Sequence, residues 1–266
     1  MILAVFARVL GFLDFDVSAS AAAQTGSSSG ITGLAPFGVL EGAIQYCDFP
    51  PPEGCLTTLK YNVNDAGATI GDLDFDGQGG GANEVNEMIK GGNKNPLCSV
   101  QETPPPGCQT TEPSKSGNST GQIRDAMSWR LSQTTGECDT IAEVIGPDTD
   151  GNGRPEVRQE CNPWREGVGD TDGDGGSCDN IMYMGDERGS CRIIAIPVIQ
   201  GAVLPPPNQD VTNWEFALFW LDSLDQCTGN NCEIKGYWIG AEVRVSGLLG
   251  VLDPSITPFT VVKLVE

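Results

Sequence analysis

The sequence predicts a mainly β protein: a two-layer, β-sandwich-like domain with long irregular loops, one or two short helices and a glycine- and aspartate-rich insert. Three observations carry this prediction. The 266 residues include 35 glycines and 18 prolines, a content that favours many turns. Several apolar segments of the C-terminal half have the length of strands. Ten cysteines stand in loop-like sequence, as in disulfide-braced exported domains.

Three parts of unequal length are expected: an apolar N-terminal segment (1–23), a Gly/Ser-rich linker (24–33) and a β-rich domain (34–266) that carries the insert (146–190). The first segment, "MILAVFARVLGFL", is interrupted by Arg8 and has no basic stretch before it, so it is not a clean signal peptide. It is also too short to span a bilayer, and we expect no membrane span in this chain. Either the chain begins inside a longer protein, or this segment has another purpose.

The first half of the domain alternates short strands with turns and two helices. A helix after the glycine turn should be capped by Asn83, with Val85, Met88 and Ile89 facing inward. A second helix should be capped by Thr120, with Ile123, Ala126, Met127, Arg130 and Leu131 at helical spacing. Strand-like segments are expected at 14–23, 34–47, 55–62 and 138–146, with a proline turn at 47–55.

The second half is more strongly β. Segments 192–201 and 213–221 are apolar on both faces, as central strands of a two-layer fold would be. Segment 233–245 alternates Tyr237, Ile239, Ala241, Val243 and Val245 with polar residues, which predicts one solvated face. The last strand is 259–266. The tryptophans of these segments, Trp214, Trp220 and Trp238, are expected in the core.

The charge balance narrows the possible partners. The chain has 15 basic and 36 acidic residues, which gives a net charge of −21. Because a nucleic-acid interface needs clustered Lys and Arg against the phosphates, nucleic-acid binding is not expected. The same acidity favours soluble chains that repel each other, or the uptake of cations.

The cysteine pattern predicts five disulfides rather than a zinc site, because no CxxC pair and no histidine occur. Sequence does not fix the connectivity. Pairing of nearest neighbours would give 47–55, 98–108, 138–161, 178–191 and 227–232. The cysteines are Cys47, Cys55, Cys98, Cys108, Cys138, Cys161, Cys178, Cys191, Cys227 and Cys232.

The segment "DTDGNGRPE" has the spacing of a calcium-binding loop. Oxygen ligands stand at loop positions 1, 3, 5 and 9, a glycine at position 6 permits the sharp turn, and a backbone carbonyl is available at position 7. These positions are Asp148, Asp150, Asn152, Glu156, Gly153 and, for the carbonyl, Arg154.

A second copy, "DTDGDGGSCD", supplies Asp170, Asp172, Asp174 and Asp179. Both copies lack the glutamate of position 12, where Gln159 and Ile181 stand, so neither is an EF-hand. We expect helix-free calcium turns, because clustered carboxylates repel one another without a cation. The alternative is two solvated acidic turns without an ion.

The segment "DLDFD" has related spacing, with Asp72, Asp74 and Asp76. Leu73 and Phe75 between them look like strand residues, which favours a structural role. Calcium binding is the alternative reading.

The common catalytic arrangements are missing. Without histidine neither a Ser/His/Asp nor a Cys/His site can form, and the phosphate-binding loop motif is also missing. Paired carboxylates could serve a hydrolase, but the acidic clusters lie in glycine turns. We therefore expect no enzyme and no catalytic residues.

The order of several segments resembles the TadE/TadG-like proteins, relatives of the tight-adherence (Flp) pilus-assembly machinery. The resemblance rests on "FARVLGFLDFDVSASAAA", "LAPFGV", "LDFDGQGGGANEVNEMIKGG", "TTEPSKSGNSTGQIRDAMSWRL", "RIIAIPVIQG", "EFALFWL", "IKGYWIGAEV" and "VVKLVE". It implies a non-catalytic protein of the bacterial cell envelope, exported or surface-attached.

The resulting functional prediction is a subunit of a surface appendage or filament, stabilised by disulfides and calcium. Its partners would be further copies of itself or other pilus components, and residues 1–23 could supply a strand to a neighbouring subunit. Packing of these residues within their own domain is the alternative. The alternative function is a calcium-dependent adhesin or binding module for a surface glycan or protein.

Overall fold

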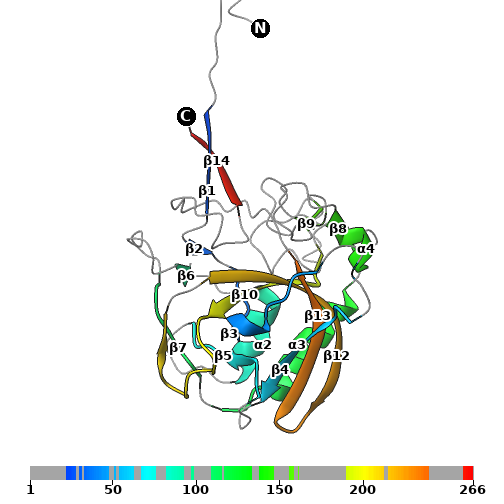
Figure 1. Ribbon diagram of the computed structural model, residues 1–266. Helices are drawn as coiled ribbons and strands as arrows, with labels where there is room; N and C mark the ends of the chain where they lie inside the picture. Colours follow the sequence, from blue (N-terminus) through cyan, green and yellow to red (C-terminus); the bar gives the residue numbers. More distant parts are fainter. Residues whose placement is uncertain are drawn as a thin grey trace, which may run out of the picture.

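Six strands form the centre of the molecule, which we describe from a computed structural model (Figure 1). They are β3 (Phe37–Leu40), β4 (Thr57–Asn62), β5 (Ile70–Asp72), β10 (Ile193–Ile199), β12 (Glu215–Thr228) and β13 (Asn231–Ile239). The structure describes residues 22–27, 30–31, 33–47, 51, 54–62, 67–75, 82–92, 97–98, 109–115, 117–133, 138–146, 156–158, 161, 190–212, 215–239 and 260–265.

The six strands close into a barrel in the order β10-β12-β13-β4-β5-β3. Strands β10, β12, β13 and β4 pair antiparallel, whereas the pairs β4–β5 and β3–β10 are parallel. The long β12–β13 hairpin is bridged near its tip by the Cys227–Cys232 disulfide. Closure leaves none of the six strands as a bare edge.

Shorter elements surround the barrel. The helical ones are η1 (Glu41–Ala43), α2 (Ala82–Gly91), α3 (Thr120–Ser132) and α4 (Ile141–Val144). The strands are β1 (Ala22–Ser27), β2 (Gly30–Ile31), β6 (Leu97–Cys98), β7 (Glu112–Pro113), β8 (Ile145–Gly146), β9 (Glu156–Val157), β11 (Asp210–Val211) and β14 (Thr260–Val265). They pair as β1–β14, β2–β6, β7–β11 and β8–β9.

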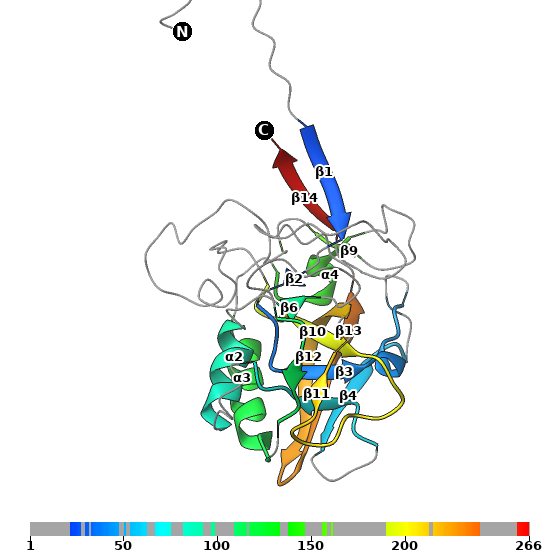
Figure 2. The ribbon, with the colours of Figure 1, turned by 90° about the vertical axis from the view of Figure 1, so that its left-hand side faces the viewer.

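One hydrophobic cluster fills the barrel and draws side chains from all six strands. Phe37, Leu59, Ile70, Ile196 and Phe219 are among its fully buried members. Apolar residues of α2 and α3 belong to the same cluster, so the two helices pack against the barrel and complete its core (Figure 2).

A second cluster covers the other face of β10 and β12. Ile193 and Ala195 of β10, and Leu218 and Trp220 of β12, pack there against irregular segments such as the one around Phe75. These two strands are therefore buried on both faces, as the sequence predicts.

The prediction of a mainly β fold is confirmed, but the two-layer sandwich is wrong because the sheet closes into a barrel. The reason is that two different arrangements bury both faces of a strand. A central strand between packed layers and a barrel strand whose outer face is covered have the same apolar pattern. Closure depends on the parallel pairs that β3 and β5 make, and these two short strands have no distinctive pattern.

The predicted helices form, with small differences at their starts. Helix α2 begins at Ala82, so Asn83 lies inside the first turn rather than at the cap. Helix α3 starts with Thr120 as its first helical residue, so its cap is Ser119 rather than the predicted Thr120. The Asn118 carboxamide oxygen accepts a hydrogen bond from the Thr120 amide at 2.9 Å and so satisfies a free N–H of the first turn.

Helix α2 ends at a close contact between two glycines. The Gly92 amide donates to the Met88 carbonyl, and Gly92 has φ +66°, a left-handed conformation that side chains disfavour. A Cβ at Gly92 would also collide with the backbone of Gly33. The approach of α2 to the segment before β3 therefore requires glycine at this position.

A buried arginine joins the helices to the barrel. Arg130 on α3 is 2% exposed, and its Nε donates to the Ile89 carbonyl of α2 at 2.6 Å. Its Nη1 donates to the carbonyls of Cys191 and Ile193 at 2.9 and 3.1 Å. Burial lowers the pKa of Arg130 to about 9, and the side chain is still a cation at neutral pH. Three carbonyls from two elements and one loop thus depend on one charged donor.

Two local predictions are wrong. Segment 138–146 is not a strand throughout: residues Ile141–Val144 form α4, and only Ile145–Gly146 is β. In β13 Ile239 is buried as predicted, but the other inward side chains are Ile234 and Trp238, while Tyr237 is only half-buried. Residues 240–245 of the predicted strand lie outside the described part. The Trp238 Nε1 donates to the Ala43 carbonyl at 3.0 Å, and this bond lets the large ring be buried on the inner face.

The N- and C-terminal strands form a separate ribbon. Strand β1 pairs antiparallel with β14, from Ala22 with Val265 to Ser27 with Thr260. The ribbon extends away from the barrel in both views (Figures 1 and 2). Strands β1 and β2 take up part of segment 24–33, which was predicted to be a linker. Residues 1–21 lie outside the described part.

Among the described residues, no helix has the length and apolar content that a membrane crossing requires.

We expect Arg130→Met to lower the free energy of unfolding by about 3 kcal/mol or more, because buried carbonyls lose their charged donor. Urea denaturation of the oxidised protein measures the loss. The matched control is Arg124→Met on the same helix, since Arg124 is exposed and its ion pair among the described residues is with exposed Asp125. Its effect should stay within about 0.5 kcal/mol. Equal losses in the two variants would contradict the role of Arg130.

Candidate functional site

The predicted calcium ligands lie almost entirely outside the described residues. This holds for Asp148, Asp150, Asn152, Arg154, Asp170, Asp172, Asp174, Asp179 and, in the second prediction, Asp76. The backbone of Glu156 is described as the first residue of β9. What the structure describes is how the chain enters and leaves each acidic stretch.

The first acidic stretch is the connection between two paired strands. Ile145 pairs with Val157 and Gly146 with Glu156, so residues 147–155 leave and return at neighbouring positions. Arg158 strengthens this closure, because its amide donates to the Val144 carbonyl at 2.8 Å and its Nε to the Ile145 carbonyl at 3.0 Å. A loop with pinned ends loses less conformational entropy when it wraps around an ion.

The second acidic stretch is also closed at its base. It lies within residues 162–189, which begin after Cys161 and end before Ser190. The Ser190 amide donates to the Cys161 carbonyl at 3.1 Å, so the two ends of this segment meet. Both acidic stretches therefore start and end at one place, which we call the insert base: residues 138–146, 156–158, 161 and 190.

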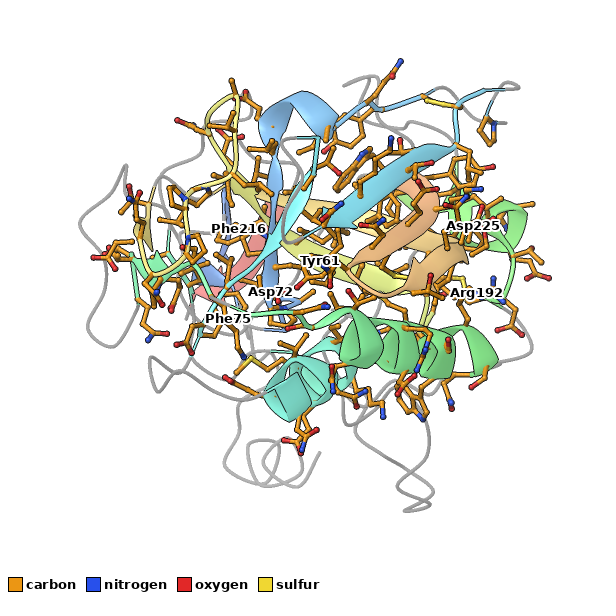
Figure 3. The ribbon with its side chains drawn as sticks, turned by 90° about the horizontal axis from the view of Figure 1, so that it is seen from below. Tyr61, Asp72, Phe75, Arg192, Phe216 and Asp225 are labelled. Carbon is orange, nitrogen blue, oxygen red and sulfur yellow. A yellow bond between two sulfur atoms is a disulfide. The ribbon has the colours of Figure 1, made fainter. Side chains whose placement is uncertain are left out.

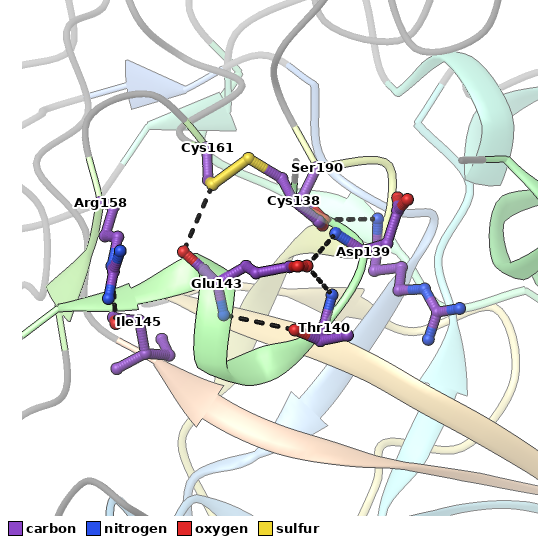
Figure 4. The surroundings of a disulfide bond; sticks show 9 residues. Cys138, Asp139, Thr140, Glu143, Ile145, Arg158, Cys161 and Ser190 are labelled. Atoms are coloured by element: carbon purple, nitrogen blue, oxygen red, sulfur yellow. Dashed lines mark hydrogen bonds between the residues drawn. A yellow bond between two sulfur atoms is a disulfide. The ribbon is translucent and has the colours of Figure 1, made fainter. Parts of the chain in front are cut away.

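A disulfide holds the insert base together (Figure 4). Cys138 is bonded to Cys161, and both residues are buried. The Ser190 hydroxyl donates to the Cys138 carbonyl at 2.8 Å, so the end of the second stretch is tied to the same bridge. A disulfide stabilises mainly by restricting the unfolded chain, in the typical case by about 2–4 kcal/mol.

A capping box shapes the short helix of the insert base. The Thr140 hydroxyl accepts from the Glu143 amide, and the Glu143 carboxylate accepts from the amides of Thr140 and Asp139 at 2.9 and 3.1 Å. The hydrogen bonds with Thr140 lower the pKa of Glu143 below its usual range. The pattern Thr-x-x-Glu is a known helix start, and it explains why a helix replaces the predicted strand here.

The disulfide predictions are confirmed where the structure describes both partners. The bridges Cys47–Cys55, Cys138–Cys161 and Cys227–Cys232 match the nearest-neighbour pairing. Cys98 and Cys191 are also disulfide-bonded. Their predicted partners, Cys108 and Cys178, lie outside the described residues, so these two pairings stay predictions. No described cysteine is a free thiol.

Asp72 and Asp74, the other predicted ligands, are both buried, at 6% and 7% exposure. The Tyr61 hydroxyl donates to Oδ2 of Asp72 at 2.8 Å and accepts from the Ser119 amide at 3.0 Å. Figure 3 shows where Tyr61 and Asp72 lie in the molecule. Leu73 and Phe75 are buried, as a structural role requires, although β5 ends at Asp72 and Phe75 lies in a turn. Within the described part of the chain, no group of three or more potential metal-ligating side chains occurs.

Burial raises the pKa of Asp72 above its usual value of 3.8. The Ser119 side chain, the Tyr61 hydroxyl and the positive charge of Lys115 oppose this rise. Burial and the charge of Asp72 in turn raise the pKa of Tyr61, so its hydroxyl keeps the proton that it donates.

Tyr61, Ser119 and Lys115 were missed from the sequence. Tyr61 lies on β4 and Ser119 begins α3, 58 residues apart, so only the fold brings them to Asp72. The Lys115 ammonium pairs with the Glu84 carboxylate of α2 at 3.2 Å, with both side chains largely buried. An apolar pattern does not reveal contacts of this kind.

Comparisons of the chain with family models, with curated proteins and with solved structures give no match. The resemblance to TadE/TadG-like proteins therefore stays a prediction.

We expect the Asp72 carboxyl to make stability depend on pH. Because its pKa is higher in the folded than in the unfolded chain, the folded chain holds this proton more tightly. The stabilising contribution is full below pH 3.8 and is lost as the pH rises through the folded-state pKa. Relative to Asp72→Asn, the wild type should therefore lose free energy of unfolding as the pH rises from acid to neutral. Urea denaturation across this range measures the difference.

Tyr61→Phe is the companion variant. The Tyr61 hydrogen bond favours the ionised carboxylate, so its removal should raise the pKa of Asp72 further. The loss of free energy of unfolding with rising pH should then extend to higher pH than in the wild type. A difference from Asp72→Asn that does not change with pH would contradict the buried position of this carboxyl.

Proposed function

We propose that this chain is a non-catalytic structural protein of the cell surface, a subunit of an appendage or filament, with disulfides and calcium as its braces. The observation that carries the proposal is that every described cysteine is disulfide-bonded. Disulfides persist outside the cytoplasm, where reducing systems are missing. The proposed setting in the bacterial envelope follows from the resemblance to TadE/TadG-like proteins.

The positions of the disulfides support a bracing role. Cys227–Cys232 closes the tip of the longest hairpin, Cys47–Cys55 closes the turn before β4, and Cys138–Cys161 closes the insert base. Two of these bridges close loops beside the barrel, and the third joins two barrel strands near the tip of their hairpin. A protein exposed to shear and proteases needs its loops to resist local opening, because cleavage follows such opening.

The β1–β14 ribbon suggests how copies could associate. Within the described residues each of its strands has one hydrogen-bonded neighbour, so the opposite edge presents backbone N–H and C=O groups. A two-stranded ribbon alone is marginally stable in water. Pairing with the same ribbon of a second copy would add strands and supply the missing stability.

Calcium is the proposed cofactor of the insert. Its support is that both acidic stretches have closed ends at the insert base, through the β8–β9 pair and the Ser190–Cys161 hydrogen bond. Closed ends limit the distance that the chain of each stretch can span, whether or not an ion is present. Calcium would offset the repulsion among carboxylates that the sequence spaces as ligands.

The second candidate is a calcium-dependent adhesin or binding module. The observation that favours it is that both acidic loops start from one base, as recognition loops commonly do on a rigid scaffold. The two candidates differ in assembly: a subunit must polymerise, whereas a binding module remains a monomer.

We expect the native protein to form ordered oligomers or filaments that negative-stain microscopy shows and that light scattering measures as multiples of 28.1 kDa. Val262→Pro in β14 should abolish assembly, because proline removes a backbone donor and breaks strand pairing. The control is Val203→Pro in an exposed loop, with Val203 71% exposed. A wild type that remains monomeric at high concentration would refute the subunit and leave the binding module.

We expect calcium to raise the melting temperature of the oxidised protein by about 3 °C at about ten times the dissociation constant, because it binds the folded state alone. Asp150→Asn combined with Asp172→Asn should remove most of this shift. Asp210→Asn, an exposed acidic residue of β11, is the control and should keep it. Identical melting in calcium and in EDTA would argue for solvated acidic turns.

A further inference from the structure

A cavity of about 310 Å³ opens beside the barrel, where β4 and β5 meet the loop before α3 and the loop after β10. Tyr61, Asp72 and Lys115 line it on the polar side. Its volume is at the lower end of the range of ligand sites, so it suits a group the size of one side chain rather than a nucleotide or an oligosaccharide.

The Ser114 and Tyr61 hydroxyls at the cavity have hydrogen-bond partners, whereas one carboxylate oxygen has none among the described residues. The Ser114 hydroxyl donates to the Pro206 carbonyl at 2.6 Å and accepts from the Gln209 amide at 3.1 Å. The Tyr61 hydroxyl is occupied by Asp72 and Ser119, as described above. Oδ1 of Asp72 is buried and accepts no hydrogen bond among the described residues.

The charges near this oxygen do not cancel. Lys115 is the nearby cation, but its ammonium already pairs with the Glu84 carboxylate at 3.2 Å. When Asp72 is ionised, these three described groups together carry a net charge of −1. A buried carboxylate oxygen without a donor is costly, and a cation that also donates a hydrogen bond would offset both the charge and the missing bond.

The remaining walls are apolar. They are formed by Ile70, Leu73, Ile199, Leu204 and Pro205. The part of a ligand that extends away from the carboxylate therefore contacts hydrocarbon. Gly71 keeps this space open, because a Cβ there would lie 3.3 Å from Leu204. The ligand therefore needs a positive donor at one end and an aliphatic stem behind it.

We propose that this cavity binds a primary ammonium group on an aliphatic stem, with Asp72 as its acceptor and counter-charge. The positive ammonium offsets the negative charge of the ionised Asp72 carboxylate, which burial disfavours. Because protonation removes that negative charge, binding of the ammonium and protonation of Asp72 compete. The inference goes beyond the proposed function, since a structural subunit needs no such ligand. A free alkylamine and a lysine side chain of another polypeptide have the same chemistry.

The test is calorimetric titration of the full oxidised chain with n-hexylamine, with n-hexanol and hexanoate as neutral and anionic matches. Hexylamine should bind with a dissociation constant of about 1 mM or below, a modest value for so small a ligand. Hexanol and hexanoate should bind at least about tenfold more weakly, since a charged hydrogen bond is worth about tenfold or more.

Asp72→Asn should weaken hexylamine binding by at least about tenfold and leave hexanol binding unchanged. Asp74→Asn is the matched control, because Asp74 is similarly buried and does not line the cavity. If Asp72→Asn fails to fold, the comparison of amine with alcohol on the wild type still decides. Equal binding of hexanol and hexylamine, an unaffected folded Asp72→Asn, or no amine binding would each overturn the proposal.

The source of the ammonium group is resolved by a further titration with Nα-acetyl-lysine methylamide. Binding similar to that of hexylamine supports a lysine side chain presented by a polypeptide. Binding of hexylamine alone supports a free amine, since the entrance would then exclude a peptide backbone. Neither result depends on assembly, so failure of the subunit proposal and failure of this one remain distinguishable.

Discussion

The Arg130 guanidinium is the constraint on which the arrangement of helices and barrel depends. It donates to the Ile89 carbonyl of α2 and to the carbonyls of Cys191 and Ile193, where the chain enters β10. A buried cation without a carboxylate partner is tolerable only when several dipoles are aimed at it. All of these hydrogen bonds to Arg130 form together only when helix α2, helix α3 and the start of β10 have their observed relative positions. This one residue therefore sets the packing geometry that apolar contacts alone leave loosely defined.

The rest of the core follows from a barrel with both wall faces covered. Inner residues such as Phe219 and Trp238 pack edge to face, with ring centroids 4.9 Å apart. On the outer face Trp220 packs among irregular segments and lies under the Arg192 guanidinium, 5.5 Å from its ring. The two clusters are separated by the thickness of the β10–β12 wall, and each needs segments from distant parts of the chain.

Local sequence patterns predicted the elements better than their arrangement. Strands such as β4 and β10 and helices α2 and α3 lie where periodicity placed them, because their burial is decided by near neighbours. Barrel closure, the Tyr61–Asp72 hydrogen bond and the role of Arg130 join residues far apart in sequence, and composition carries no information about such pairs. The Thr-x-x-Glu pattern of the Thr140–Glu143 capping box is visible in the sequence, but the strand-like residues around it favoured the prediction of a strand. Three nearest-neighbour disulfides were predictable because short separations favour ring closure.

The closed ends of the two acidic stretches have a consequence for how this protein can diversify. The residues that flank 147–155 lie next to each other, as do those that flank 162–189, so a longer or shorter segment could start and end at the same positions. Doubling such a loop costs only about 0.6 kcal/mol of closure entropy. At the insert base, one loop can thus be replaced by another, by evolution or by protein engineering. New surface chemistry could be acquired there without the scaffold being redesigned.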